Sequence, residues 1–115
     1  MRGDMNYRTM EAGLALDKVI AELVMGLVVV PDPVNHRGFA VREAGPHGFD
    51  LPAYSTEIKS AWAVAEKLSL WTGKFAEGEY WAFESITAYI NGTVSRAPSA
   101  PLAICREAIR LVLSR

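Results

Sequence analysis

The amino-acid sequence predicts an α+β fold, in which three amphipathic helices pack on a small antiparallel sheet of three or more strands. Two observations lead to this prediction. Apolar residues recur at helical spacing in three separate segments, and short runs rich in aromatic and β-branched residues lie between the second and third of them. The chain has 115 residues, half of them hydrophobic, which is enough for one core, so we expect a single domain over residues 1–115.

The first helix is expected over residues 10–26, after an N-terminal segment, residues 1–8, that we expect to be flexible. Thr9 is suited to cap its first turn and Gly26 to end it. Apolar residues three and four positions apart predict the side that enters the core, whereas Asp17 lies off that stripe. The core candidates in this helix are Leu16, Ile20 and Leu23.

Residues 28–54 differ in composition from the rest of the chain. They contain four of the six prolines and both histidines, so the sequence predicts a long Pro/Gly-rich loop here. Within it, residues 28–30 and 39–41 are rich enough in β-branched and aromatic side chains that they could pair as a small hairpin.

The second helix is expected over residues 55–69, where Ser55 or Thr56 could cap the free amides of the first turn. Its apolar stripe supplies the core candidates Ile58, Trp62 and Leu68. Turn residues separate the segments that follow, and strands are expected over residues 70–76, 80–87 and 93–96.

The third helix is expected over residues 99–114, with Ser99 as its N-cap. Cys105 and Ile109 lie on its apolar stripe and are the core candidates there. The expected order is therefore helix, irregular segment with a hairpin, helix, three strands and helix.

Three segments of the chain are similar to one known family. Residues 10–26 resemble its first helix, residues 51–58 followed by Ala61 and Trp62 resemble the start of its second helix, and residues 100–108 resemble its last helix. In this order they resemble the phage ABA sandwich domain family over nearly the whole chain. The resemblance implies a small protein of a tailed phage or prophage, folded as an α/β/α sandwich, with no established activity and no catalytic residues to transfer.

Composition and charge argue against several classes of function. With 12 basic and 13 acidic residues the formal net charge is −1, whereas a dedicated nucleic-acid binder has an excess of Lys and Arg. The longest apolar run, residues 23–30, is far shorter than the roughly 20 residues that a membrane-spanning helix needs. A single cysteine, Cys105, allows no internal disulfide, which suits the cytoplasm of a bacterial host.

The sequence contains no catalytic or cofactor-binding motif, so we expect a protein that is not an enzyme and has no cofactor or metal. His36 and His47 share a loop with acidic residues but lack the spacing of metal ligands. Cys105 lies on an apolar helix stripe, where free cysteines act as small buried hydrophobes.

The 28–54 segment is the candidate partner-binding surface, because long loops on a rigid scaffold often carry function and exposed Phe and Arg side chains often anchor interfaces. In a second interpretation, Phe39 and Phe49 only close over the edge of the sheet. The candidate residues are His36, Arg37, Phe39, Arg42, His47 and Phe49.

We therefore expect a non-enzymatic accessory protein that binds a host or phage protein, such as a component of host defence. One alternative is a nucleic-acid-associated protein of phage replication or packaging, which would use Arg106 and Arg110 on the last helix. Another is a nucleotide-signal binder or a minor enzyme that uses the 28–54 segment.

Overall fold

The computed structural model describes residues 10–32, 38–42, 49–74, 78–83 and 95–113. Outside these ranges lie the N-terminal segment 1–8, residues 33–37 and 43–48 of the predicted 28–54 loop, and residues 75–76, 84–87 and 93–94 of the predicted strands. The described elements, in chain order, are α1 (Leu14–Val19), the π-helix η1 (Ile20–Val24), β1 (Val28–Pro31), β2 (Phe39–Arg42), β3 (Phe49–Asp50), α2 (Ile58–Leu68), β4 (Trp71–Lys74), β5 (Tyr80–Phe83), β6 (Ser95–Ala97) and α4 (Ala100–Leu113).

The described strands form two antiparallel sheets of three strands each. Sheet A has the order β1-β2-β3, and sheet B has the order β4-β5-β6. The predicted hairpin is confirmed, with Val29 opposite Val41 and Val30 opposite Ala40. The short third strand of sheet A, Phe49–Asp50, was not predicted, because two residues are too few to give a period.

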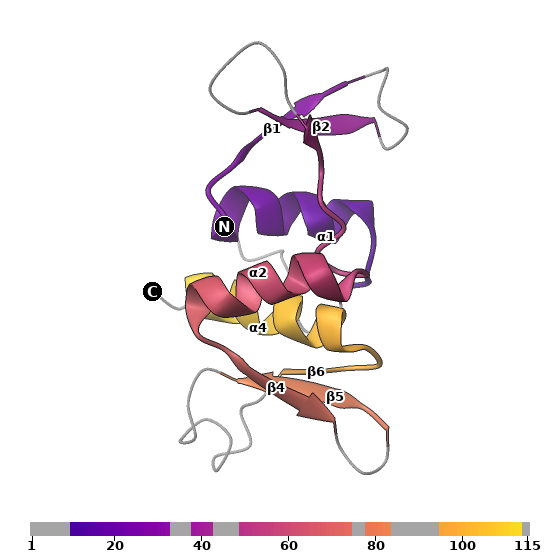
Figure 1. Ribbon diagram of the computed structural model, residues 1–115, viewed down its shortest axis with the longest axis vertical. Helices are drawn as coiled ribbons and strands as arrows, with labels where there is room; N and C mark the ends of the chain where they lie inside the picture. Colours follow the sequence, from indigo (N-terminus) through magenta and orange to yellow (C-terminus); the bar gives the residue numbers. More distant parts are fainter. Residues whose placement is uncertain (1–9, 33–37, 43–48, 75–77, 84–94, 114–115) are drawn as a thin grey trace.

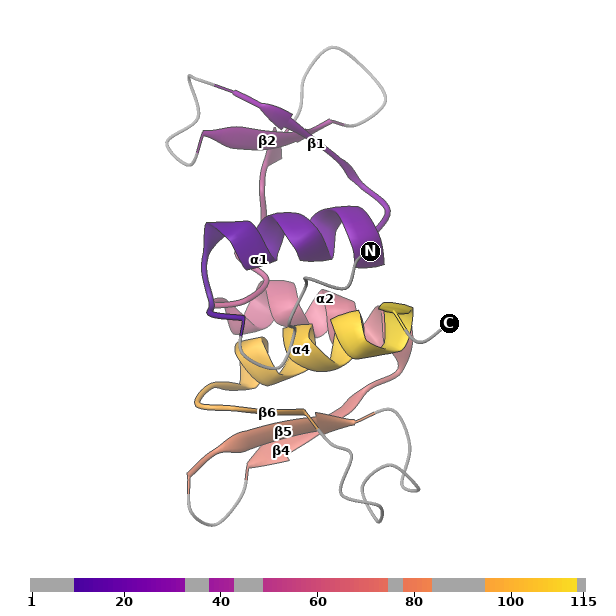
Figure 2. The ribbon, with the colours of Figure 1, turned by 180° about the vertical axis from the view of Figure 1, so that it is seen from behind.

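The helices form the middle of the molecule, and one sheet lies at each end (Figure 1). The α+β sandwich that the sequence predicts is confirmed, with its strands divided between two sheets rather than gathered in one. Seen from both sides, helices α1, α2 and α4 run side by side and in the same direction (Figures 1 and 2). The molecule is elongated, with extents of 47 × 29 × 25 Å, because the sheets extend it along one axis.

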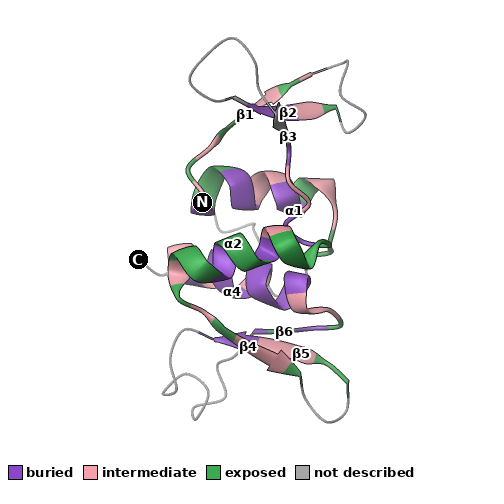
Figure 3. Ribbon diagram, viewed as in Figure 1, coloured by how far each residue is buried: buried purple, intermediate pink, exposed green. Residues whose placement is uncertain are grey.

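Helix α4 is the central element of the fold. It packs against α2, against η1 and against all three strands of sheet B. Nine of its residues are buried, which matches a helix that is covered on most sides (Figure 3). Its N-terminus is the predicted one, since the Leu102 N–H donates to the Ser99 hydroxyl at 3.4 Å.

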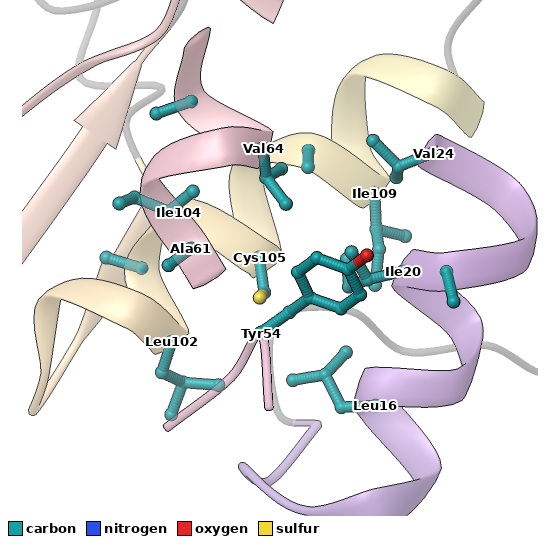
Figure 4. Packing of buried hydrophobic residues seen from close by; sticks show 14 of the residues in the cluster. Leu16, Ile20, Val24, Tyr54, Ala61, Val64, Leu102, Ile104, Cys105 and Ile109 are labelled. Atoms are coloured by element: carbon teal, nitrogen blue, oxygen red, sulfur yellow. The ribbon is translucent and has the colours of Figure 1, made fainter. Parts of the chain in front are cut away.

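Tyr54 and Cys105 lie at the centre of the core. Figure 4 shows the Tyr54 ring between the three helices, with Cys105 beside it. Of the predicted core residues, four are fully buried and Leu68 is half-buried against the same cluster. The four that are confirmed as fully buried are Leu16, Ile20, Cys105 and Ile109.

The prediction for Leu23 is wrong, because this side chain is 42% exposed. The buried arc of α1 and η1 includes Asp17 and Ala21 in addition to the predicted Leu16 and Ile20. This arc is rotated away from Leu23, and the wider turn of the π-helix changes the spacing further. The helical segment ends as predicted, with Gly26 at a φ of +69°, a conformation that favours glycine.

The predictions for Ile58 and Trp62 are also wrong, since these side chains are 52% and 49% exposed. The buried side of α2 is centred on Ala61, Val64 and Ala65. Small alanines allow α2 to approach α4 closely, and the large apolar residues beside them are left at the surface.

The second helix also begins later than predicted, at Ile58, after a turn over residues 54–56. Ser55 does not cap α2, because its hydroxyl is hydrogen-bonded to α1 instead. The helix ends at Leu68, and Ser69 takes the left-handed conformation that turns the chain directly into β4.

Candidate partner-binding surfaces

Among the described residues, the fully buried charged side chains are Asp17 and Glu107. Each of them is hydrogen-bonded to a serine in another part of the fold. The Asp17 carboxylate accepts hydrogen bonds from the Ser55 hydroxyl at 2.6 Å and from the Ser55 backbone N–H at 2.8 Å. The Ser55 hydroxyl in turn accepts the Gly13 N–H at 2.9 Å. This group therefore connects the start of α1 to the turn before α2. Asp17 lies in the first turn of α1, where the positive end of the helix dipole favours a carboxylate.

The second buried acid, Glu107, joins α4 to sheet B. Its carboxylate accepts hydrogen bonds from the Ser95 hydroxyl at 2.9 Å and from the Nε and Nη2 groups of Arg110 at 2.8 and 2.6 Å. Paired, hydrogen-bonded charges of this kind can be buried without a large penalty. Arg110 is therefore a structural residue rather than part of a free basic patch.

Arg106, the other arginine considered for nucleic-acid contact, is also engaged within the chain. Its guanidinium donates to the Arg96 carbonyl at 2.8 Å and to the Met10 carbonyl at 3.1 Å. It thereby connects α4 to β6 and to the segment before α1. Neither arginine is held in a way that favours binding to phosphate.

Cys105 is placed as a core residue and not as a nucleophile. Burial raises the pKa of its thiol well above the ordinary value, and the nearby Asp17 carboxylate raises it further. A thiol with a raised pKa is protonated at neutral pH and reacts slowly. Burial also raises the pKa of Tyr54, with smaller contributions from Asp17 and Cys105.

Within the described ranges, no three His, Cys, Asp or Glu side chains are grouped as metal ligands. The same ranges include no helix that is both long and apolar enough to cross a membrane.

The residues predicted for partner binding fall largely outside what the structure describes. His36, Arg37 and His47 lie outside the described residues. The backbone of Arg42 pairs with Val28 and that of Phe49 with Val41, and their side chains are not described.

Phe39 is the candidate partner-binding residue whose side chain the structure describes. Its side chain is half-buried against the core, and the Lys18 ammonium lies 5.1 Å from the centre of its ring. Alternate residues of a strand share a face, and Val41 on the same face is fully buried, so Phe39 faces α1. The candidate role of Phe39 in partner binding stays a prediction.

Three aromatic rings lie together on the face of sheet B that points away from α4. Trp71 stacks on Phe83 with the ring planes 4° apart and the centroids 6.3 Å apart, and Phe83 stacks on Trp81 at 4.8 Å. Trp71 is 65% exposed, whereas Phe83 is buried. We call Trp71, Trp81 and Phe83 the aromatic surface of sheet B.

Gly73 determines how this surface is built. A Cβ atom at this position would lie 2.3 Å from the Trp81 ring, so only glycine leaves room for the indole over the strand. Gly73 pairs with Trp81 across β4 and β5, and Trp71 pairs with Phe83 two residues away. Because paired residues point to the same face, this register places all three rings together.

The fold is that of an α+β sandwich. The chain belongs to the phage ABA sandwich domain family, whose family model matches residues 18–109. A solved phage protein from Bacillus cereus ATCC 14579 has a similar fold, with a TM-score of 0.60 and 24% sequence identity, and the match covers 100% of this chain and 94% of that chain. No curated protein matches the chain.

Proposed function

We propose that this phage protein acts without catalysis, by binding a protein partner through the aromatic surface of sheet B. The observation that carries the proposal is the exposure of Trp71 at the end of a stack of three nearly parallel rings. Tryptophan and other aromatic residues are enriched at the energetically important centres of protein interfaces. A rigid strand presents these rings, so little conformational entropy is lost when they are covered.

The charges beside the aromatic surface favour a protein partner over a nucleic acid. Arg96 lies opposite Trp81 on β6, and its guanidinium is 3.8 Å from the Glu79 carboxylate, with both side chains about half exposed. An apolar centre beside a mixed, solvated ion pair is the usual composition of a protein interface. The α4 arginines, which a nucleic-acid interface would use, are bound to Glu107 and to backbone carbonyls. A host protein, such as a component of host defence, is the partner that we propose.

The 28–54 segment is proposed as a second part of the binding surface. Its candidate residues are His36, Arg37, Phe39, Arg42, His47 and Phe49. Sheet A lies at the opposite end of the molecule from sheet B (Figure 1), so the two surfaces would act on separate regions of a partner or on different partners.

The proposal is tested by immobilising the protein and capturing partners from a bacterial lysate. We expect Trp71→Ala to abolish capture of a protein that the wild type retains reproducibly. Leu113→Ala is the matched control, since it removes an apolar side chain that is also about half exposed but lies at the end of α4. Retention of the same protein by Trp71→Ala, or its loss in Leu113→Ala, would place the interface elsewhere. Nucleic acid in the eluate in place of a protein would favour the nucleic-acid alternative.

A further inference from the structure

The exposed side of α2 has the composition of a helix that packs against another helix. Ile58 and Trp62, one turn apart, are each about half exposed, although apolar side chains of this size are usually buried. In the same helix the smaller Ala61 and Ala65 are buried against the core. The two large side chains therefore form an apolar stripe on the outside of the fold.

The charges beside this stripe have no partner at helical spacing within their own helix. Lys59 and Glu66 are both exposed, and the residues three and four positions from each of them in α2 carry no opposite charge. Successive residues of an α-helix are about 100° apart when viewed along the helix axis. In this view Lys59 and Glu66 lie on the same side of Trp62, about 20° from each other, and Ile58 lies on the opposite side of Trp62. Lys59 precedes Trp62 by three residues, and Glu66 follows it by four.

We propose that two copies of this chain associate through α2, with the two helices antiparallel and crossing near Trp62. A twofold axis at that point brings the same side of each helix together. Measured along the helix axis, Lys59 and Glu66 of the partner subunit then differ in height by only about 1.5 Å, so they can form an ion pair. The twofold axis repeats this pair at the other end of the contact. Ile58 packs beside Trp62 of the partner subunit.

The charge pattern favours a second copy of this chain as the partner and an antiparallel orientation of the two α2 helices. In a parallel pair of α2 helices, the side that carries Lys59 and Glu66 would face the Ile58 side of the partner helix, where neither charge meets an opposite charge. The antiparallel pair instead makes two complementary ion pairs beside an apolar centre. A single pair of helices of 11 residues buries less surface than the roughly 1,200 Å² of a standard stable interface, so the dimer should dissociate in the micromolar range.

Sedimentation equilibrium of the purified full chain across micromolar concentrations tests the proposal. We expect a reversible monomer–dimer equilibrium in the wild type, and Trp62→Ala should raise the dissociation constant at least about tenfold. Trp71→Ala removes an even more exposed tryptophan from sheet B and should leave the dissociation constant unchanged. A monomer at every concentration, or a dimer that Trp71→Ala disrupts and Trp62→Ala does not, would overturn the proposal.

A charge swap tests the antiparallel arrangement. Lys59→Glu alone and Glu66→Lys alone should each raise the dissociation constant about tenfold, because each change places like charges opposite each other twice in the dimer. The double variant Lys59→Glu with Glu66→Lys should return the dissociation constant to within about threefold of the wild type. Both residues are exposed, so thermal unfolding should be almost unchanged in all three variants. A double variant that is no better than the single variants would refute the antiparallel pair.

Discussion

Ser55→Ala should destabilise the fold far more than a surface serine substitution, because the Ser55 hydroxyl holds two elements together. It donates to the Asp17 carboxylate at 2.6 Å and accepts the Gly13 N–H at 2.9 Å, and both Ser55 and Asp17 are fully buried. The substitution removes a hydrogen bond to a charged group, which contributes roughly 1.5–3 kcal/mol, and weakens the bonding of the Gly13 amide by about 1 kcal/mol more.

The expected loss in the free energy of unfolding is therefore about 3 kcal/mol. For a chain of this size this corresponds to a decrease in Tm of about 12 °C, at about 4 °C per kcal/mol. Such a loss is a large part of the roughly 5–15 kcal/mol by which small domains are stable. The assay is urea unfolding followed by circular dichroism, with a thermal melt as the second measurement.

Ser60→Ala is the matched control. The Ser60 hydroxyl donates to the Glu57 carboxylate at 2.7 Å, but this bond is exposed to solvent. Its removal should change the free energy of unfolding by less than about 0.5 kcal/mol. If Ser55→Ala and Ser60→Ala unfold at the same urea concentration, the connection between Asp17 and Ser55 does not stabilise the fold and the reasoning is refuted.

Three further predictions concern other parts of the molecule. Gly73→Ala should displace the Trp81 ring and destabilise the fold by about 1–3 kcal/mol. The expected signs are a changed near-ultraviolet circular dichroism spectrum and a lower Tm. An unchanged spectrum would contradict the close contact between Gly73 and the Trp81 ring. Because the pKa of the Cys105 thiol is raised in the folded protein, only the unfolded thiol ionises above about pH 8.5. The contribution of Cys105 to the free energy of unfolding should therefore be complete below that pH and should fall above it by up to about 1.4 kcal/mol per pH unit. Urea melts at pH 8 and pH 10 should show a smaller pH dependence for Cys105→Ala than for the wild type. Arg37→Ala with Arg42→Ala should weaken partner capture and leave Tm almost unchanged, and a lower Tm would assign these arginines to the fold.

Much of the fold could be predicted from the sequence because it depends on local signals. The hairpin of residues 28–31 and 39–42 followed from β-branched and aromatic residues, and the start of α4 followed from a serine before a helical stripe. The fully buried Leu16 and Ile109 followed from helical spacing. In each case the residues that decide the structure are close together in the sequence.

The buried acids could not be predicted, because their partners are distant in the sequence. Asp17 is buried through Ser55, 38 positions away, and Glu107 through Ser95, 12 positions away. A carboxylate in an isolated helix is expected at the surface, and only the fold supplies the hydrogen bonds that make its burial favourable. The burial of Asp17 also explains the error at Leu23, since it rotates the buried arc of the helix away from that residue.

The candidate surfaces were missed for a related reason. Helical periodicity assigns the largest apolar residues to the core, yet α2 buries Ala61 and Ala65 and exposes Ile58 and Trp62. Likewise, Trp71 in β4 is exposed while the much smaller Ala82 in β5 is fully buried. Close packing of α2 and of sheet B on α4 requires small side chains on the inner face, so the large apolar residues of these elements are left on the outer face. The side chains of Ile58, Trp62 and Trp71 are at least about half exposed, so they bury less of their apolar surface in the fold than core residues do. Binding to a partner or to a second copy is the role that their exposure favours.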